Sequence, residues 1–119
     1  GYRNLTGLDL LPIRDPDARV GDMHKMPFVG DAFDLVYASH CFEHAYDFGM
    51  VELEILRVLR IGGWLFAAFP INYVTSSHDR YDFKSAEGFL RWFDPAHLTR
   101  LWHRETPTEV SVLARLETK

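Results

Sequence analysis

The sequence predicts an α/β fold built around a mostly parallel β-sheet. Short apolar runs that end in turn residues recur along the chain, and one stretch with helical periodicity stands between two of them. A helix that links two strands is the usual connection of a parallel pair, so this order favours a parallel sheet. A chain of 119 residues is long enough for one domain with one hydrophobic core.

Three short strands are predicted in the N-terminal part of the chain. Residues 5–11 (LTGLDLL) form an apolar run, and residues 19–23 (RVGDM) form a second run after the polar loop at residues 13–18. Gly30 and Asp31 then have turn chemistry, and residues 33–38 (FDLVYA) favour a third strand.

The clearest helix is predicted over residues 45–60. Val51, Ile55 and Val58 recur at steps of three and four residues, which places them on one face of a helix. We expect the glycine pair at residues 62–63 to end this helix, because glycine adopts the left-handed backbone conformation common after a last helical turn.

The second half of the chain predicts a buried strand, a short helix and a hairpin. Residues 64–69 (WLFAAF) are almost continuously apolar, as in a parallel strand that is covered on both faces. Residues 85–92 suit a short helix. The runs at residues 98–105 and 109–117 suit two hairpin strands, although a helix over the last run remains open.

The predicted core combines the central strands with the apolar face of the long helix. Glu54 and Arg57 are placed on the solvent side of that helix as a surface ion pair. The expected core residues are Leu35, Val36, Leu56, Leu59, Leu65, Phe66 and Phe69.

The composition excludes several classes of protein. Hydrophobic residues make up 47% and charged residues 25% of the chain, which excludes a disordered chain, a collagen-like repeat and a coiled coil. The net charge of −4 argues against a nucleic-acid binder, because such proteins usually carry a basic face. The single cysteine, Cys41, excludes an intrachain disulfide.

No membrane or secretion signal is visible in the sequence. The longest apolar stretch, residues 64–71, is much shorter than the roughly 20 residues that a membrane-spanning helix needs. The first residues, GYRNLTG, lack the basic and apolar regions of a signal peptide. We therefore expect a cytoplasmic protein that does not associate with membranes.

Polar residues stand where the predicted strands end. Asp9 and Asp22 each close a strand, and ligands of open α/β sheets bind outside the carboxyl ends of the strands, although a turn or capping role is the plainer alternative. Residues 39–44 (SHCFEH) follow the third strand. Their spacing lacks the Cys and His sets of zinc sites, so no metal is expected. A Cys41 nucleophile with a histidine base remains an alternative to a simple polar lining.

Four segments together resemble the class I S-adenosylmethionine-dependent methyltransferases, and within them the small-molecule type. The segments are GLDL, GDMHKMPF, AFDLVYASHCFEH and ELEILRVLRIGGWLFAAFP, and they span residues 5–70 in the family's order. The resemblance implies a Rossmann-like sheet, mostly parallel, that ends in a C-terminal antiparallel hairpin. It also implies S-adenosylmethionine as cofactor and transfer of its methyl group to a small-molecule acceptor, such as a sugar or lipid precursor.

The resemblance also implies which residues meet the cofactor. Asp9 matches the acidic residue that holds both ribose hydroxyls, and a carboxylate suits this role because it accepts two charge-assisted hydrogen bonds. Asp22 matches the acceptor of the adenine amino group, and the backbone N–H of Met23 meets the ring. The implied cofactor-binding residues are Asp9, Leu10, Asp22, Met23, Ser39 and His40.

The same resemblance leaves the catalytic groups open. Methyl transfer is an in-line displacement for which positioning supplies most of the rate. A general base is needed only where the acceptor must lose a proton. His40 and His44 are the candidates for that base.

One family motif is missing from the sequence. The family carries a glycine-rich turn of the form G-x-G-x-G after its first strand, and this sequence contains none. Residue 1 falls just before the family's second strand, so we expect a partial domain, truncated at the N-terminus, that lacks the central strand of the sheet.

Two arrangements would satisfy the strand edges that such a loss exposes. The neighbouring strands pair directly with each other, or a second chain covers the gap. We expect a homodimer. The alternative function is a non-enzymatic relic that acts as a binding or oligomerisation module.

Overall fold

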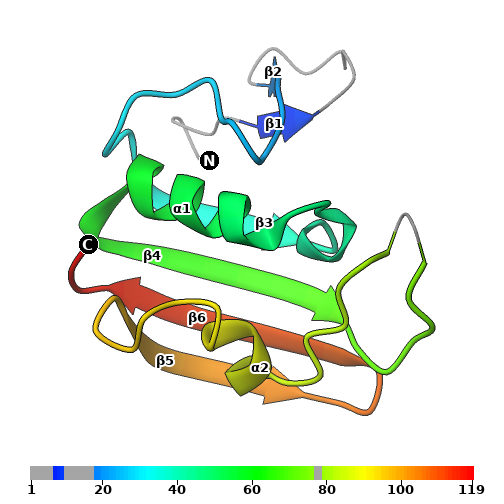
Figure 1. Cartoon of the computed structure of the whole chain (residues 1–119). Coiled ribbons are helices and arrows are strands. Elements are labelled where there is room, and N and C mark those ends of the chain that lie inside the picture. Colours follow the sequence, from blue (N-terminus) through cyan, green and yellow to red (C-terminus); the bar gives the residue numbers. More distant parts are fainter. Residues whose placement is uncertain (1–6, 10–17, 77–78) are drawn as a thin grey trace.

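The structure is a computed structural model, and it describes residues 7–9, 18–76 and 79–119 (Figure 1). In residues 7–9 and 18–20 the description covers the backbone alone. The elements in chain order are β1 (Gly7–Asp9), β2 (Ala18–Val20), β3 (Phe33–Ser39), the 3₁₀ helix η1 (Phe42–His44), α1 (Phe48–Val58), β4 (Leu59–Pro70), α2 (Ala86–Leu90), β5 (Leu98–Glu105) and β6 (Glu109–Leu116).

The described strands form two sheets. β1 and β2 pair in parallel, while the larger sheet has the order β3-β4-β6-β5. β3 and β4 are parallel, and β6 runs antiparallel to both of its neighbours. The predicted Rossmann-like arrangement with a C-terminal antiparallel hairpin is therefore confirmed. The alternative of a helix over residues 108–117 is wrong, because that segment forms β6.

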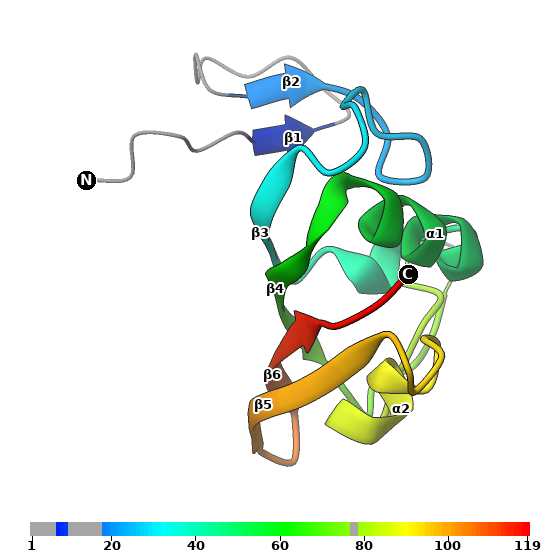
Figure 2. The ribbon, with the colours of Figure 1, turned by 90° about the vertical axis from the view of Figure 1, so that its left-hand side faces the viewer.

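Both α-helices lie on one face of the larger sheet (Figure 2). Phe48, Val51 and Ile55 of α1 are fully buried, and so is Phe89 of α2. The ring of Phe48 packs against that of Phe89 with centroids 5.7 Å apart. This face holds the core.

None of the described helices has the length and apolar composition of a membrane-spanning segment.

The long helix is shorter than predicted, and the glycine pair does not end it. α1 stops at Val58, and Leu59 already has extended backbone and begins β4. Gly62, with φ of +85°, and Gly63 lie inside β4. A Cβ on Gly63 would stand 2.9 Å from the carbonyl oxygen of Asp34, so glycine permits the close approach of β3 where the strand register shifts.

Two of the predicted core residues lie on the opposite face of the sheet. Leu35 is 46% exposed and pairs in register with Trp64, and Phe66 pairs with Tyr37 on the same face. The rings of Tyr37 and Phe66 stack with centroids 5.0 Å apart. These side chains face away from the helices because side chains alternate across a strand, and no described helix covers this face (Figure 2).

Of the two alternatives for the exposed strand edges, direct pairing of the flanking strands is wrong for the described residues. β1 pairs with β2, and β3 pairs with β4, but no strand pairing joins the two sheets in the described residues. β3 therefore has a hydrogen-bonded strand neighbour on one side only within the described part of the chain. Its other edge faces the side of the molecule where β1 and β2 lie (Figure 2).

Candidate functional site

A cavity of about 510 Å³ lies between the turn that follows β2, the strand β3 and the segment around η1. It extends along β3 from Phe33 to Ala38 and reaches the carboxyl end of the strand, where ligands of α/β sheets bind. Most of its walls are apolar, and a few polar groups converge on it. The polar and aromatic residues in its lining include Asp22, His24, Tyr37, Cys41, His44 and Tyr46.

The carboxylate of Asp22 is held by His24. The backbone N–H of His24 donates to Oδ1 of Asp22 over 2.9 Å, and Nδ1 of the His24 ring lies 2.5 Å from the same oxygen. These bonds, led by that from the backbone N–H, hold the pKa of Asp22 below its usual value. The Asp22 side chain is 38% exposed, so an ionised carboxylate reaches the cavity.

His24 itself is buried and bonded on its other nitrogen. Its Nε2 accepts from the backbone N–H groups of Tyr46 and Asp47, at 3.1 and 3.2 Å. The Tyr46 ring stacks on the imidazole with centroids 3.5 Å apart. Asp47 is also the N-cap of α1, where its side chain accepts from the backbone N–H of Met50. The sequence around His24 carries no signal of these contacts, which only the fold creates.

His44 borders the same cavity and contacts two acidic residues. Its Nδ1 lies 2.8 Å from Oδ1 of Asp79, and its Nε2 lies 3.8 Å from Oε2 of Glu43. The His44 side chain is half exposed, whereas the side chain of Glu43 is only 4% exposed. Within the described residues Oε1 of Glu43 has no hydrogen-bond partner. The chain therefore places an acid–imidazole pair at the cavity.

Of the remaining predicted cofactor residues, only some lie at the cavity. Met23 lines it together with Asp22. Ser39 and His40 are not among the lining residues, and Nε2 of His40 contacts Oε1 of Glu109 at 3.1 Å. Leu10 and the side chain of Asp9 lie outside the described residues.

Cys41 is not activated as a nucleophile. Burial raises the pKa of its thiol to about 12, and the nearby charge of Glu43 adds to the rise. A thiol must ionise to attack, so at neutral pH Cys41 contributes apolar volume rather than chemistry. Within the described part of the chain, no group of three or more His, Cys, Asp and Glu residues is arranged to hold a metal ion.

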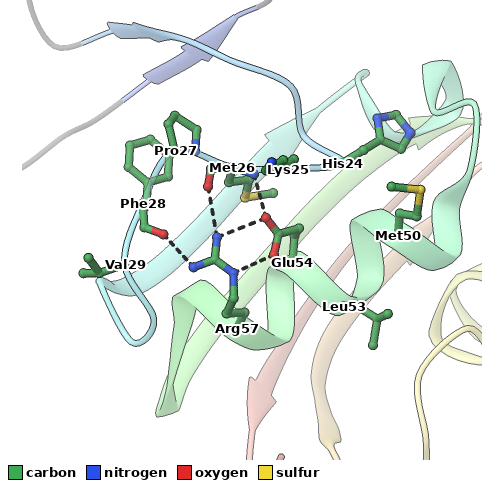
Figure 3. A pocket seen from close by; sticks show the side chains of 10 residues that line it. All are labelled: His24, Lys25, Met26, Pro27, Phe28, Val29, Met50, Leu53, Glu54 and Arg57. Carbon is green, nitrogen blue, oxygen red and sulfur yellow. Dashed lines mark hydrogen bonds and ion pairs between the residues drawn. The ribbon is translucent and has the colours of Figure 1, made fainter.

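A second, shallower cavity of about 690 Å³ lies beside α1 (Figure 3). Here Arg57 donates to both carboxylate oxygens of Glu54, at 2.6 and 3.0 Å, and to the carbonyl oxygens of Phe28 and Met26. Glu54 also accepts from the backbone N–H of Met26 at 2.7 Å. The predicted surface pair is thus a clamp that ties the segment after β2 to α1. The Glu-x-x-Arg spacing in the sequence indicated the ion pair between Glu54 and Arg57, but not the backbone groups of Met26 and Phe28 that bond to it.

A family model described as "Methyltransferase domain" matches residues 3–67, which is more than half of the chain. The chain belongs to this methyltransferase family. A phthiotriol/phenolphthiotriol dimycocerosates methyltransferase of Mycobacterium ulcerans is 40% identical over 65 residues, covering 52% of this chain and 20% of that protein. A malonyl-[acyl-carrier protein] O-methyltransferase of Legionella pneumophila is 46% identical over 44 residues, covering 37% of this chain and 16% of that protein.

Solved structures show the same methyltransferase fold. The 1,6-didemethyltoxoflavin-N1-methyltransferase of Burkholderia thailandensis superposes with a TM-score of 0.75 at 13% identity, and its structure contains S-adenosylhomocysteine. The match covers 97% of this chain and 62% of that one. The chain thus spans less than two thirds of this structure and a fifth or less of the two curated relatives.

The residues around Asp22 fit the adenine end of S-adenosylmethionine. An ionised carboxylate suits the exocyclic amino group of adenine as a hydrogen-bond acceptor, and the apolar wall beside it suits the flat ring. When bound, this cofactor supplies an activated methyl group. The sequence carries no glycine-rich turn of the family type for the methionine part, so the fit concerns the adenine end.

Proposed function

We propose that this chain binds the adenosine part of S-adenosylmethionine and contributes to methyl transfer onto a small-molecule acceptor. The observation that carries the proposal is the Asp22 carboxylate, which His24 holds at the wall of a cavity that reaches the carboxyl end of β3. Met23 belongs to the same site. By the family resemblance, Asp9 serves the ribose, Leu10 also contacts the cofactor, and Ser39 and His40 serve the methyl-donor end.

The acceptor is proposed to be a small molecule because one similar solved structure contains 1,6-didemethyltoxoflavin. One relative is named for phthiotriol and phenolphthiotriol dimycocerosates. We propose that the acceptor enters the cavity near His44, which belongs to its lining.

His44 is proposed as the general base for an acceptor that carries an acidic hydrogen. Its Nδ1 lies 2.8 Å from Oδ1 of Asp79, which orients the ring at the cavity. The imidazole would take the proton of an acceptor hydroxyl or ring N–H, and the cofactor, when bound, would supply the methyl group and keep the electron pair of the carbon–sulfur bond that breaks. His40, which contacts Glu109 at the surface, remains the second candidate.

Titration calorimetry with S-adenosylhomocysteine tests the site. Asp22→Ala removes the charge-assisted bond to adenine, so the affinity should fall by roughly 10- to 100-fold. Asp34→Ala is the matched control, because the Asp34 carboxylate is 80% exposed and pairs with Arg60 away from the cavity. Equal affinity of the wild type and the Asp22 variant would reject the site.

A second candidate function, oligomerisation, is favoured by the apolar face that the helices leave open. We propose that two copies pack through this face to form a homodimer. Tyr37 is 65%, Trp64 is 50% and Leu35 is 46% exposed there. None of the three carries a charge, so the patch is able to match a second copy of itself, as a symmetric interface requires.

Sedimentation equilibrium at micromolar concentration tests the dimer. The wild type is expected to dimerise and a Tyr37→Lys variant to remain monomeric, because a charge on the patch is costly to bury. A Val74→Lys variant is the control, since Val74 is 92% exposed and lies outside the larger sheet. A wild type that stays monomeric, or a Tyr37 variant that still dimerises, would contradict the proposal.

A further inference from the structure

We propose that His24 is a positioning residue that orients the Asp22 carboxylate for its ligand and couples it to the start of α1. The proposal rests on the proposed role of Asp22 in cofactor binding. It assigns a task to the only histidine that is buried among the described residues, with 5% exposure.

The hydrogen bonds of the ring determine its protonation. Nε2 faces two backbone N–H groups, of Tyr46 and Asp47, and both are donors. Nε2 must therefore carry the lone pair. In a neutral imidazole the proton then resides on Nδ1, which lies 2.5 Å from Oδ1 of Asp22. The ring is thus a donor toward Asp22 and an acceptor toward the segment before α1.

Neighbouring groups hold this ring in one plane. The Tyr46 ring lies parallel to it, with an interplanar angle of 12°. The turn that carries His24 is closed by a backbone hydrogen bond from Lys25 N–H to the Asp22 carbonyl, at 3.0 Å. Oδ1 of Asp22 accepts from both the backbone and the ring of His24, so the carboxylate is fixed before a ligand arrives. A group fixed in advance binds with a smaller loss of entropy.

The coupling to α1 follows from the second nitrogen. Asp47, whose N–H bonds to Nε2, is the N-cap of α1. A ligand on Asp22 is therefore linked through one imidazole to the start of the helix. A variant that loses both ring nitrogens should disturb both the Asp22 carboxylate and the backbone at the start of α1. A variant that keeps the function of one nitrogen should preserve only the partner of that nitrogen.

Three variants separate the two tasks of the ring. His24→Asn places an amide near Nδ1 that still donates to Asp22, and His24→Gln places an amide oxygen near Nε2 that still accepts from the backbone. His24→Phe keeps the flat ring but loses both bonds. We expect S-adenosylhomocysteine affinity to fall about tenfold or more in the Phe and Gln variants and far less in the Asn variant. Hydrogen exchange at the Tyr46 and Asp47 amides should accelerate in the Phe and Asn variants and stay slow in the Gln variant.

Two measurements on the unliganded protein keep the test independent of cofactor binding. ¹⁵N NMR of the histidine ring should show His24 as the Nδ1–H tautomer. ¹³C NMR titration should show a higher pKa for the Asp22 carboxyl in the Phe variant than in the wild type, because one bond to the carboxylate is gone.

The outcomes separate the two proposals. If the wild type binds no S-adenosylhomocysteine, the proposed function fails, and the tautomer and the Asp22 titration alone decide the role of His24. An Nε2–H tautomer, or a Phe variant with unchanged Asp22 titration, would overturn the positioning role. Equal losses of affinity in the Asn and Phe variants would reduce His24 to a structural residue.

Discussion

Leu65 and Phe66 are neighbours in β4, yet the structure predicts very different costs for removing their side chains. Leu65 is 1% exposed and faces the helices. Phe66 lies on the open face, where its ring stacks on Tyr37 with centroids 5.0 Å apart. Leu65→Ala should lower the free energy of unfolding by about 2–5 kcal/mol, from lost burial and a cavity. Phe66→Ala should lower it by less, about 1–2 kcal/mol, from a ring that is only partly buried and from its stacking contact.

Urea unfolding of both variants, followed by far-UV circular dichroism, measures these losses. The experiment is run at a low concentration, where sedimentation shows a monomer, and again at a tenfold higher concentration. If the open face joins two copies, the cost of Phe66→Ala rises with concentration and that of Leu65→Ala changes little. Equal costs in the monomer would refute the assignment of the two side chains to opposite faces.

Three further predictions follow from single residues. Cys41, with its thiol pKa near 12, should react with a disulfide reagent about a thousandfold more slowly in the folded protein than in the urea-unfolded chain, and equal rates would contradict its burial. Gly88→Ala places a Cβ 2.0 Å from the Phe83 carbonyl oxygen, so calorimetry should show a stability loss of about 1–3 kcal/mol, whereas Gly30→Ala, with its nearest atom at 3.4 Å, should be tolerated. The hydrogen bond from Arg57 lowers the pKa of Glu54 below the ordinary 4.5. As the pH falls below 4.5, Glu54 is protonated in the unfolded chain before it is protonated in the folded protein. The stability that the Arg57–Glu54 pair contributes is therefore lost as the pH falls through the lowered pKa. Glu54→Gln should therefore flatten the acid side of the stability profile, and an unchanged acid side would contradict the clamp.

Much of the fold follows from local patterns in the sequence. The apolar runs at residues 33–38 and 64–69 both became strands, and the spacing of Val51, Ile55 and Val58 placed the buried face of α1 correctly. Ser85 caps α2 by accepting from the Gly88 N–H at 2.9 Å. These features depend on backbone sterics and on period, which short segments carry by themselves. The family motifs likewise led to Asp22 and Met23.

Other features depend on what stands opposite a residue in space. Leu35 and Phe66 are as apolar as their buried neighbours, so their composition gave no sign that their face of the sheet has no described helix over it. Gly62 and Gly63 resemble a helix end in sequence, but the close approach of β3 to β4 decides their place. The sequence predicts Arg57 as a surface residue, but in the structure its guanidinium donates to the carbonyl oxygens of Met26 and Phe28.

His24 shows the same division within the site. In sequence it is one polar residue in a turn, and its type predicts neither burial nor partners. Tertiary structure brings the Tyr46 and Asp47 N–H groups, from more than twenty positions later in the chain, onto its second nitrogen. Residue type determined the presence of a carboxylate at Asp22. Contacts between segments distant in the chain decided its orientation, because a hydrogen bond depends on where its two groups meet and not on the sequence around either.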